Sequence, residues 1–303
     1  MLYIKGVQKT ILLTGASGFL GYHIMKHAQS RYRIVGTYFR HKPEIAKHDL
    51  VQINLIETAR LQQLIKKVQP QFILHCAALT KVSFCERHPA QSYHVNVHST
   101  KILSELAQAV GIPLLYVSTD SVFDGKTAPY RETALPKPIS RYGQQKRSAE
   151  EIVTVSSPQN WVCRLALLFG LGNSYHDNFL KQWIRALQNG SKIYATADEY
   201  RNPLSAKIVA AYLFQLINLI SADVEIEGKN YLHIAGDERI SFYEFARLIA
   251  EVYQINPINI IASRREDAKT PKAEDSCLET SKARKIFKWS IPSLKEQLST
   301  LRC

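Results

Sequence analysis

Short apolar segments and segments with helical spacing alternate along the first half of the chain. Between residues 58 and 68, apolar side chains recur on one helical face, at Leu61, Leu64, Ile65 and Val68. The apolar runs predict strands at Thr10–Thr14, Tyr32–Tyr38, Val51–Ile53, Phe72–His75, Pro113–Ser118 and Trp161–Leu168. The intervening segments predict helices at Phe19–Gln29, Thr58–Val68, Pro89–Val110 and Tyr142–Val155. This alternation predicts an α/β fold: a Rossmann-like, doubly wound parallel sheet covered by helices on both faces.

The pattern changes after Gly170, where a loop follows and elements become less regular. Helices are expected at Phe179–Leu187, 205–221 and Phe242–Tyr253, and strands at Lys192–Ala195 and Tyr231–Ile234. Ser241 and Glu244 match a capping box, whereas the polar segment Arg264–Ser276 reads as a loop followed by two short helices. We therefore expect a dinucleotide-binding domain at 1–170 that also receives roughly 205–235. A smaller, C-terminal substrate-binding lobe is expected from 171–204 and 236–303.

The bulk properties are those of a cytoplasmic globular protein of 303 residues, with 46% hydrophobic and 21% charged residues. No signal peptide is expected before the first strand, and the longest apolar stretch, Ile208–Ile220, is too short to span a bilayer. The cysteines show neither a CxxC spacing nor an even number, so we expect no disulfide scaffold; they are Cys76, Cys85, Cys163, Cys277 and Cys303.

The formal charge of +13 is the one unusual bulk property. The basic residues are scattered and do not form runs with interleaved aromatic residues, so we expect neither a nucleic-acid nor a membrane partner. A positive field also suits anionic ligands such as nucleotide pyrophosphates. The oligomeric state stays open, a homodimer included.

A glycine-rich segment, Thr14–Gly21, follows the first strand and opens the first helix. Gly15 would make the tight turn, Gly18 would let the backbone approach a phosphate, and Gly21 would let the helix meet the strand. The helix N-terminus then offers N–H groups and a positive dipole end to a dinucleotide pyrophosphate.

The end of the second strand indicates which dinucleotide is preferred. Sites for NAD usually place an acid there, but this chain has Arg40 and Lys42 and no acid between Thr37 and Lys42. Arg40 could bind a ribose 2′-phosphate bidentately. We therefore expect NADPH as the cofactor. The alternative is that NADH is the cofactor and that Arg40 is only a solvated loop residue.

Tyr142 and Lys146 are four residues apart, so both lie on one face of the helix that we expect to begin there after a Ser140 cap. A nearby ammonium favours the phenolate, so we expect Lys146 to lower the pKa of Tyr142 and make it a general acid or base. Thr119 ends a sheet strand, where ligands of open parallel sheets bind, and could hydrogen-bond a reacting carbonyl. The three residues predict an NAD(P)-dependent oxidoreductase acting on a carbonyl or carbinol.

With these motifs the chain resembles the extended short-chain dehydrogenases/reductases, and more narrowly the dTDP-4-dehydrorhamnose reductase family. The resemblance covers essentially the whole chain. The segments that carry it are Gly15–Gly21, Cys76–Val82, Cys85-Glu86, Asn96-Val97, Ser118–Gly125, Pro129–Glu132, Tyr142–Lys146, Asn178-Phe179 and Ser276–Leu278. It implies reduction of the 4-keto group of a nucleotide-linked deoxysugar with NADPH or NADH.

The resemblance also implies roles for single residues. Thr119, Tyr142 and Lys146 would be catalytic. The cofactor would contact Gly15, Ser17, Gly18, Phe19, Leu20, Gly21, Arg40, Asn54, Leu55, Ala77, Ala78, Tyr142 and Lys146. The substrate would contact Val82, Asp120 and Asn178. Arg201 is expected to contact the substrate for a different reason: it is a cation in a loop before a helix and could meet the nucleotide diphosphate, with a plain surface loop as the alternative. The family pattern near the sugar is not kept at Ser83, at Ser121 and in the stretch Leu165–Gly170. The resemblance therefore predicts the reaction type more firmly than it predicts which sugar is the substrate.

Two other functions remain open. Relatives of this family include a regulatory subunit of methionine adenosyltransferase, so the chain could be a non-catalytic NAD(P)-binding subunit. The complete acid/base set favours an enzyme. An epimerase or dehydratase of nucleotide sugars would differ in keeping its cofactor bound through turnover. The pairs His23/His27 and His94/His98 lack a third ligand at a diagnostic spacing, so no metal is expected.

Overall fold

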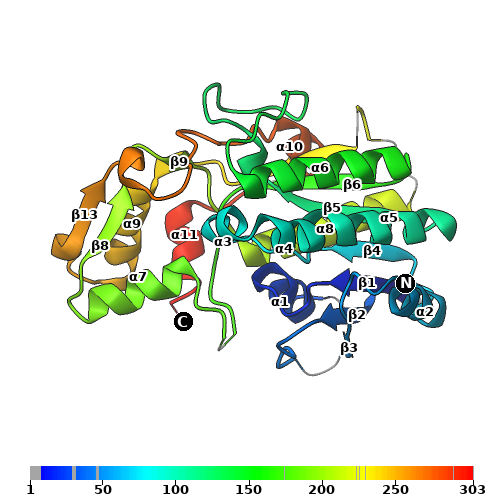
Figure 1. Cartoon of the computed structure of the whole chain (residues 1–303). Coiled ribbons are helices and arrows are strands. Elements are labelled where there is room, and N and C mark those ends of the chain that lie inside the picture. The colour runs from blue at the N-terminus through cyan, green and yellow to red at the C-terminus, as the bar shows by residue number, and fades with distance from the viewer. Residues whose placement is uncertain are drawn as a thin grey trace.

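The computed structural model describes residues 8–28, 32–45, 48–173, 175–222, 224, 226–228, 230–288 and 290–302. Its centre is a seven-stranded sheet with the order β11-β6-β5-β4-β1-β2-β3, in which every neighbouring pair is parallel (Figure 1). The strands are β1 (Lys9–Thr14), β2 (Tyr32–Tyr38), β3 (Asp49–Gln52), β4 (Phe72–His75), β5 (Leu114–Thr119), β6 (Trp161–Leu165) and β11 (Tyr231–Ile234). The Rossmann-like parallel sheet is thereby confirmed.

Helices cover both faces of this sheet. One face packs against α1 (Phe19–Lys26), α8 (Ala206–Ser221) and α10 (Ser281–Phe287), which share a core with side chains such as Ile11 and Leu74. The other face packs against α2 (Thr58–Val68), α5 (Ser99–Ala109) and α6 (Arg141–Ser156). Because the strands alternate their side chains between two apolar layers, they read in the sequence as continuous hydrophobic runs.

The helix expected at Pro89–Val110 has three parts. A short helix α4 (Pro89–Tyr93) leads into a π-helical turn at His94–His98 and then into α5. The turn holds Asn96, whose amide donates to Leu79 O at 3.0 Å and accepts from Leu79 N at 2.8 Å. The turn therefore fixes the loop after β4, which contains Ala77 and Ala78. Before it lies α3 (Val82–Arg87), a helix that the sequence pattern did not indicate.

The single strand expected at Trp161–Leu168 is wrong, because the chain changes sheets within it. β6 ends at Leu165, and Ala166 N still donates to Ile234 O at 3.2 Å. The chain then forms β7 (Leu168–Phe169), which pairs with β10 (Leu204–Ser205) in a separate two-stranded sheet. Both pieces are apolar, so the sequence shows no break where the partner strand changes.

The remaining elements lie beside the main sheet, on the left in Figure 1. They are α7 (Phe179–Gln188), β8 (Ile193–Thr196), β9 (Tyr200–Arg201), β12 (Ile240–Ser241), α9 (Phe242–Tyr253), β13 (Ile260–Ser263) and α11 (Leu294–Ser299). The Ser241–Glu244 capping box of α9 is confirmed. The segment expected as a loop from Arg264 carries one 3₁₀ turn at Arg265–Asp267. The proposed domain division stays a prediction, and among the described residues no helix is long and apolar enough to cross a membrane.

Candidate active site

The glycine-rich loop joins β1 to α1 through very close backbone contacts. Gly15 has φ +73°, and a Cβ there would lie 2.7 Å from the backbone of Ala77. A Cβ on Gly21 would lie 2.1 Å from Gly15 O, so only glycine lets α1 meet the loop. Gly18 N donates to Gly15 O at 2.8 Å and places Phe19 at the start of α1.

The N-terminus of α1 remains open toward a ligand. In the part of the chain that the structure describes, no side chain caps this helix, and its first turn holds no acid. The N–H groups near Phe19 and Leu20 therefore present a positive end that can receive a pyrophosphate. His176 Nε2 donates to the Ser17 carbonyl at 2.8 Å, which ties the loop after β7 to the glycine loop.

Arg40 and Asn54 follow neighbouring strands at the same edge of the sheet. Tyr38 is in register with Gln52, and the Gln52 amide donates to Phe39 O at 3.0 Å. The Arg40 guanidinium is exposed, lies 5.8 Å from the Phe39 ring centroid, and has no carboxylate partner among the described residues. It is therefore free to meet an anion at the place where the sequence predicts a ribose phosphate. Leu55 follows Asn54 in the same loop, half-buried.

Thr119, Tyr142 and Lys146 come together at the carboxyl end of β5. Ser140 caps α6 by accepting from Gly143 N at 3.1 Å, as the sequence predicts. A Cβ on Gly143 would lie 2.2 Å from Ser121 O, so glycine lets α6 approach the turn after β5. All three functional side chains are buried in this arrangement.

The protonation of this site differs from the expectation in one respect. Burial and the charge of Asp120 raise the pKa of Tyr142, although its contact with Thr119 acts in the opposite sense. The expected lowering of that pKa by Lys146 is therefore wrong for this structure. The Lys146 ammonium instead donates to Val117 O at 2.6 Å and lies 4.0 Å from the Tyr116 ring centroid. Burial lowers the pKa of Lys146 to about 7, and the carboxylate of Glu150 opposes that shift.

Asp120 connects the candidate catalytic residues to the elements beside the main sheet. Its carboxylate accepts from the Thr119 hydroxyl at 3.1 Å and from the Ser276 hydroxyl at 3.0 Å, and Arg201 Nε lies 3.4 Å away. Arg201 also pairs with Glu199 at 3.0 Å, and Glu199 with Lys272 at 2.5 Å. We call the five residues Asp120, Glu199, Arg201, Lys272 and Ser276 the lobe cluster.

Comparison with known proteins assigns the chain to a family. The model of the RmlD substrate binding domain family matches residues 9–302. The chain belongs to this family.

Known relatives of this RmlD-family protein include proteins with different names. Methionine adenosyltransferase 2 subunit beta from Bos taurus is 32% identical over 250 residues, which are 82% of this chain and 73% of that protein. The dTDP-4-dehydrorhamnose reductase of Aggregatibacter actinomycetemcomitans is 27% identical over 285 residues, covering 91% and 92% of the two chains. The structure of dTDP-4-dehydrorhamnose reductase from Bacillus anthracis in complex with NADP superposes with a TM-score of 0.82 at 26% identity, covering 97% and 98%.

Two of the predicted substrate-binding residues, Asn178 and Arg201, form contacts within this RmlD-family chain that hold its structure. The Asn178 side chain caps α7 by accepting from Lys181 N at 3.1 Å, and it donates to Gly170 O at 2.9 Å. Arg201 is held by two carboxylates in the lobe cluster. Val82 is half-buried at the start of α3. The contacts assigned to the cofactor and substrate stay predictions.

No functional role was predicted from the sequence for Glu150, Arg164, Glu199 or Lys272. Glu150 could have been found, because it lies one helical turn after Lys146 on the same face of α6. Arg164 pairs with Glu150 at 2.7 Å, and both side chains are at most 3% exposed. Glu199 and Lys272 are 73 positions apart, a spacing that carries no local signal.

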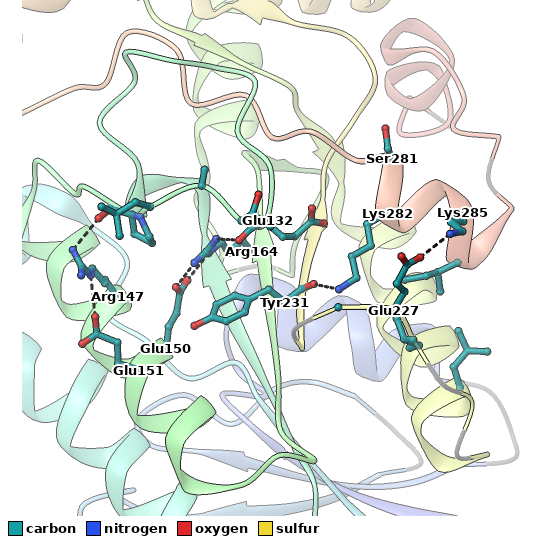
Figure 2. Close-up of a pocket in the computed structure, with 18 of the residues that line it drawn as sticks. Glu132, Arg147, Glu150, Glu151, Arg164, Glu227, Tyr231, Ser281, Lys282 and Lys285 are labelled. Atoms are coloured by element: carbon teal, nitrogen blue, oxygen red, sulfur yellow. Dashed lines mark hydrogen bonds and ion pairs between the residues drawn. The ribbon is translucent and has the colours of Figure 1, made fainter.

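This buried ion pair lines a cavity of about 1090 Å³ (Figure 2). Its lining includes Glu150, Arg164 and Tyr231, together with Glu132 and Lys282. Its lining does not include Thr119, Tyr142 or Lys146, so it is separate from the three candidate catalytic residues. Over the described ranges, no group of three or more His, Cys, Asp or Glu side chains is placed to hold a metal ion. The absence of a metal stays a prediction.

Proposed function

We propose that the protein is an NADPH-dependent reductase of the 4-keto group of a nucleotide-linked deoxysugar. The observation that carries this proposal is the convergence of Thr119, Tyr142 and Lys146 at the carboxyl end of β5. This is the edge of the sheet at which the glycine loop opens. A parallel sheet binds its ligands at this edge.

The glycine loop fits a dinucleotide. Gly15, Gly18 and Gly21 remove the side chains that would fill the space between β1, α1 and Ala77, and the α1 N-terminus is uncapped in the described chain. When bound, the nicotinamide would supply a hydride. Lys146 would hold its ribose, and Arg40 would hold a 2′-phosphate.

The chain's own residues then handle the carbonyl and the proton. The Thr119 hydroxyl, which donates to Asp120 in this structure, would turn to donate a hydrogen bond to the keto oxygen and so polarise and orient the carbonyl. Tyr142 would donate its phenolic proton to that oxygen as negative charge develops there. Burial raises the pKa of Tyr142, so the phenol is protonated before the reaction and suited to act as the acid.

The test is NADPH oxidation, followed by absorbance, with a panel of nucleotide-linked 4-keto deoxysugars. Tyr142→Phe removes the general acid, so turnover should fall by about 10²–10⁴-fold. Tyr194→Phe is the matched control, because Tyr194 is 67% exposed and lies on β8, outside the candidate site. Equal turnover by Tyr142→Phe and wild-type protein would contradict the proposal.

Cofactor choice gives an independent test. Charge-assisted hydrogen bonds from Arg40 to a 2′-phosphate predict that Arg40→Ala weakens NADPH binding by roughly 10–100-fold. The binding of NADH by Arg40→Ala should not change. Arg33→Ala is the control, because it removes an exposed arginine of β2 that pairs with Asp49, and it should change the affinity for neither cofactor. Fluorescence titration of both cofactors measures this. Loss of both affinities, or of neither, would rule out the role of Arg40.

A second candidate is an NAD(P)-binding subunit of a methionine adenosyltransferase. The similarity to subunit beta of methionine adenosyltransferase 2, at 32% identity over 82% of this chain, favours it. In that case the protein should form a stable complex with a methionine adenosyltransferase, and Tyr142→Phe should leave the complex and its activity unchanged. Size-exclusion chromatography and adenosyltransferase assays of the mixture distinguish the two functions. An epimerase or dehydratase would retain its cofactor through purification.

A further inference from the structure

Lys146 is buried, and few of the groups around it are charged. The ionisable side chains around it come from α6, β4, β5 and the loop after β4, namely Tyr142, Glu150, His75, Tyr116 and Cys76. Burial raises the pKa of Cys76 to about 12 and raises those of both tyrosines, so all three are neutral near pH 7. Burial lowers the pKa of His75 to about 3, so that ring is neutral too. Among these described neighbours, Glu150 supplies the negative charge.

Glu150 is held firmly in place by three donors from the sheet. Its carboxylate accepts from the Ser118 hydroxyl of β5 and from Arg164 of β6, through Nε at 3.0 Å and Nη2 at 2.7 Å. The Arg164 guanidinium lies between two rings, 5.1 Å from Phe123 and 4.6 Å from Tyr231. Figure 2 shows this ion pair and the Tyr231 ring beside it. A buried pair of this kind cannot lose one partner without stranding the other.

Ser118 links this ion pair to the reaction centre, because it is the residue before Thr119 on β5. One carboxylate therefore touches the strand that presents Thr119 and acts on the ammonium of Lys146.

We infer that Glu150 is a positioning residue of the active site: its carboxylate favours the charged form of Lys146 and fixes, through Ser118, the strand end that presents Thr119. The inference rests on the roles of Lys146 and Thr119 in the proposed reductase. Glu150 itself does not meet the substrate. Its effect reaches the reaction through the two residues beside it.

The sign of the effect follows from the surroundings of Lys146. Burial lowers its pKa to about 7, and Glu150 acts in the opposite direction. Glu150→Gln keeps the volume and a hydrogen-bond acceptor for Ser118 but removes the charge. The pKa of Lys146 should then fall by on the order of one to three units, the range typical for loss of a close opposite charge. Lys146 would be mostly neutral at pH 7.

The experiment measures the ionisation of Lys146 without any substrate. Protein labelled with ¹³C-lysine is titrated by NMR, with the Lys146 Cε signal assigned from Lys146→Arg. Glu151→Gln is the matched control, because Glu151 is the next residue on α6, is 61% exposed and pairs with Arg147. The expected result is a lower pKa of Lys146 in Glu150→Gln and no change in Glu151→Gln. An unchanged pKa in Glu150→Gln overturns the inference.

Two further variants separate charge from folding. Glu150→Asp retains the carboxylate and should keep the pKa of Lys146 near the wild-type value. A fall equal to that in Glu150→Gln would show a purely structural effect and overturn the inference.

The double variant Glu150→Gln/Arg164→Gln is used if the single variant does not fold, because it leaves no stranded charge. Its Lys146 pKa should still fall, by less than in the single variant, and an unchanged value would again overturn the inference. Because no readout needs turnover, a failure of the proposed reductase would be seen separately in the NADPH assay.

Discussion

Two ion clusters lie next to the candidate catalytic residues, and they are built in opposite ways. The sheet cluster consists of Ser118, Glu150, Arg164 and His233, all on regular elements of the main sheet or on α6. The lobe cluster joins the turn after β5 to β9 and to the segment at 272–276. Side chains of the Glu150–Arg164 pair are 1% and 3% exposed, whereas Lys272 of the lobe cluster is 31% exposed.

The difference separates a fixed half of the site from an adjustable half. Glu150 of the sheet cluster lies one helical turn after Lys146 on α6. The proposed cofactor chemistry needs a fixed geometry at Lys146. The lobe cluster ends at Asp120, which touches Thr119, and its other members lie on a two-residue strand and a loop. Loops tolerate change more readily than a packed sheet. If the proposed function is right, substitutions in the lobe cluster should therefore alter substrate choice while Lys146 stays in place.

Removing Arg164 should have the largest effect on stability. Arg164→Ala strands the Glu150 carboxylate in the core, so the free energy of unfolding should fall by about 3–5 kcal/mol. Arg60→Ala is the control, since Arg60 forms an exposed pair with Glu57 and should cost less than about 1 kcal/mol. Denaturant unfolding followed by circular dichroism measures both. Similar losses in the two variants would show that the sheet cluster is not the fixed half.

Much of the main sheet could be predicted from the sequence because its signals are local. The bounds of β2, β4 and α2 match the expected ones, since each follows from an apolar run or a helical face. Tyr142 and Lys146 share a helix, so their proximity is local too. The strand β9, its partner β12 and the change of sheet after Leu165 depend on contacts between distant segments, and no pattern within two residues can reveal them.

The same limit applies to the candidate site. Arg201 was expected to meet the substrate because it is a cation in a loop before a helix, where it could bind a nucleotide diphosphate. Its partners Asp120 and Glu199 become apparent only when β9 lies beside the end of β5. The pKa of Tyr142 was expected to fall because spacing shows the ammonium one turn away. Burial and the neighbouring Asp120, which spacing cannot show, raise it.

Acid should weaken the sheet cluster through His233. This ring is buried, and Arg164 Nη1 can only donate to its Nε2 at 3.4 Å, so Nδ1 carries the proton toward Tyr130 O at 3.0 Å. Burial, with Arg164 adding to it, lowers the pKa of His233 to about 3. The unfolded chain therefore binds the extra proton below about pH 6.5, and stability is lost as the pH falls from there toward 3.

At pH 5 this single histidine should lower the free energy of unfolding by about 2 kcal/mol relative to pH 7. His233→Gln should remove that part of the pH dependence, whereas His94→Gln, at an exposed position, should retain it. Urea unfolding of the three proteins at both pH values measures the difference. The same pH dependence in His233→Gln and wild type would mean that His233 is protonated in the folded protein.

Replacing Arg201 should have the smallest effect on stability and should act mainly on turnover. Arg201→Gln leaves Glu199 paired with Lys272 at 2.5 Å and Asp120 bonded to Ser276 at 3.0 Å, so neither carboxylate is stranded. The free energy of unfolding should fall by only about 1 kcal/mol. Turnover of the keto sugar should fall by about tenfold or more, because Asp120 no longer has a cation that holds it against Thr119.

Arg284→Gln, which removes an exposed ion pair with Asp237, is the matched control and should change neither quantity by a comparable amount. Unfolding and NADPH oxidation are measured on the same preparations. If Arg201→Gln lost as much stability as Arg164→Ala and kept its turnover, the predicted difference between the two clusters would be wrong. The lobe cluster would then be a structural support like the sheet cluster, and substrate selection would have to lie elsewhere.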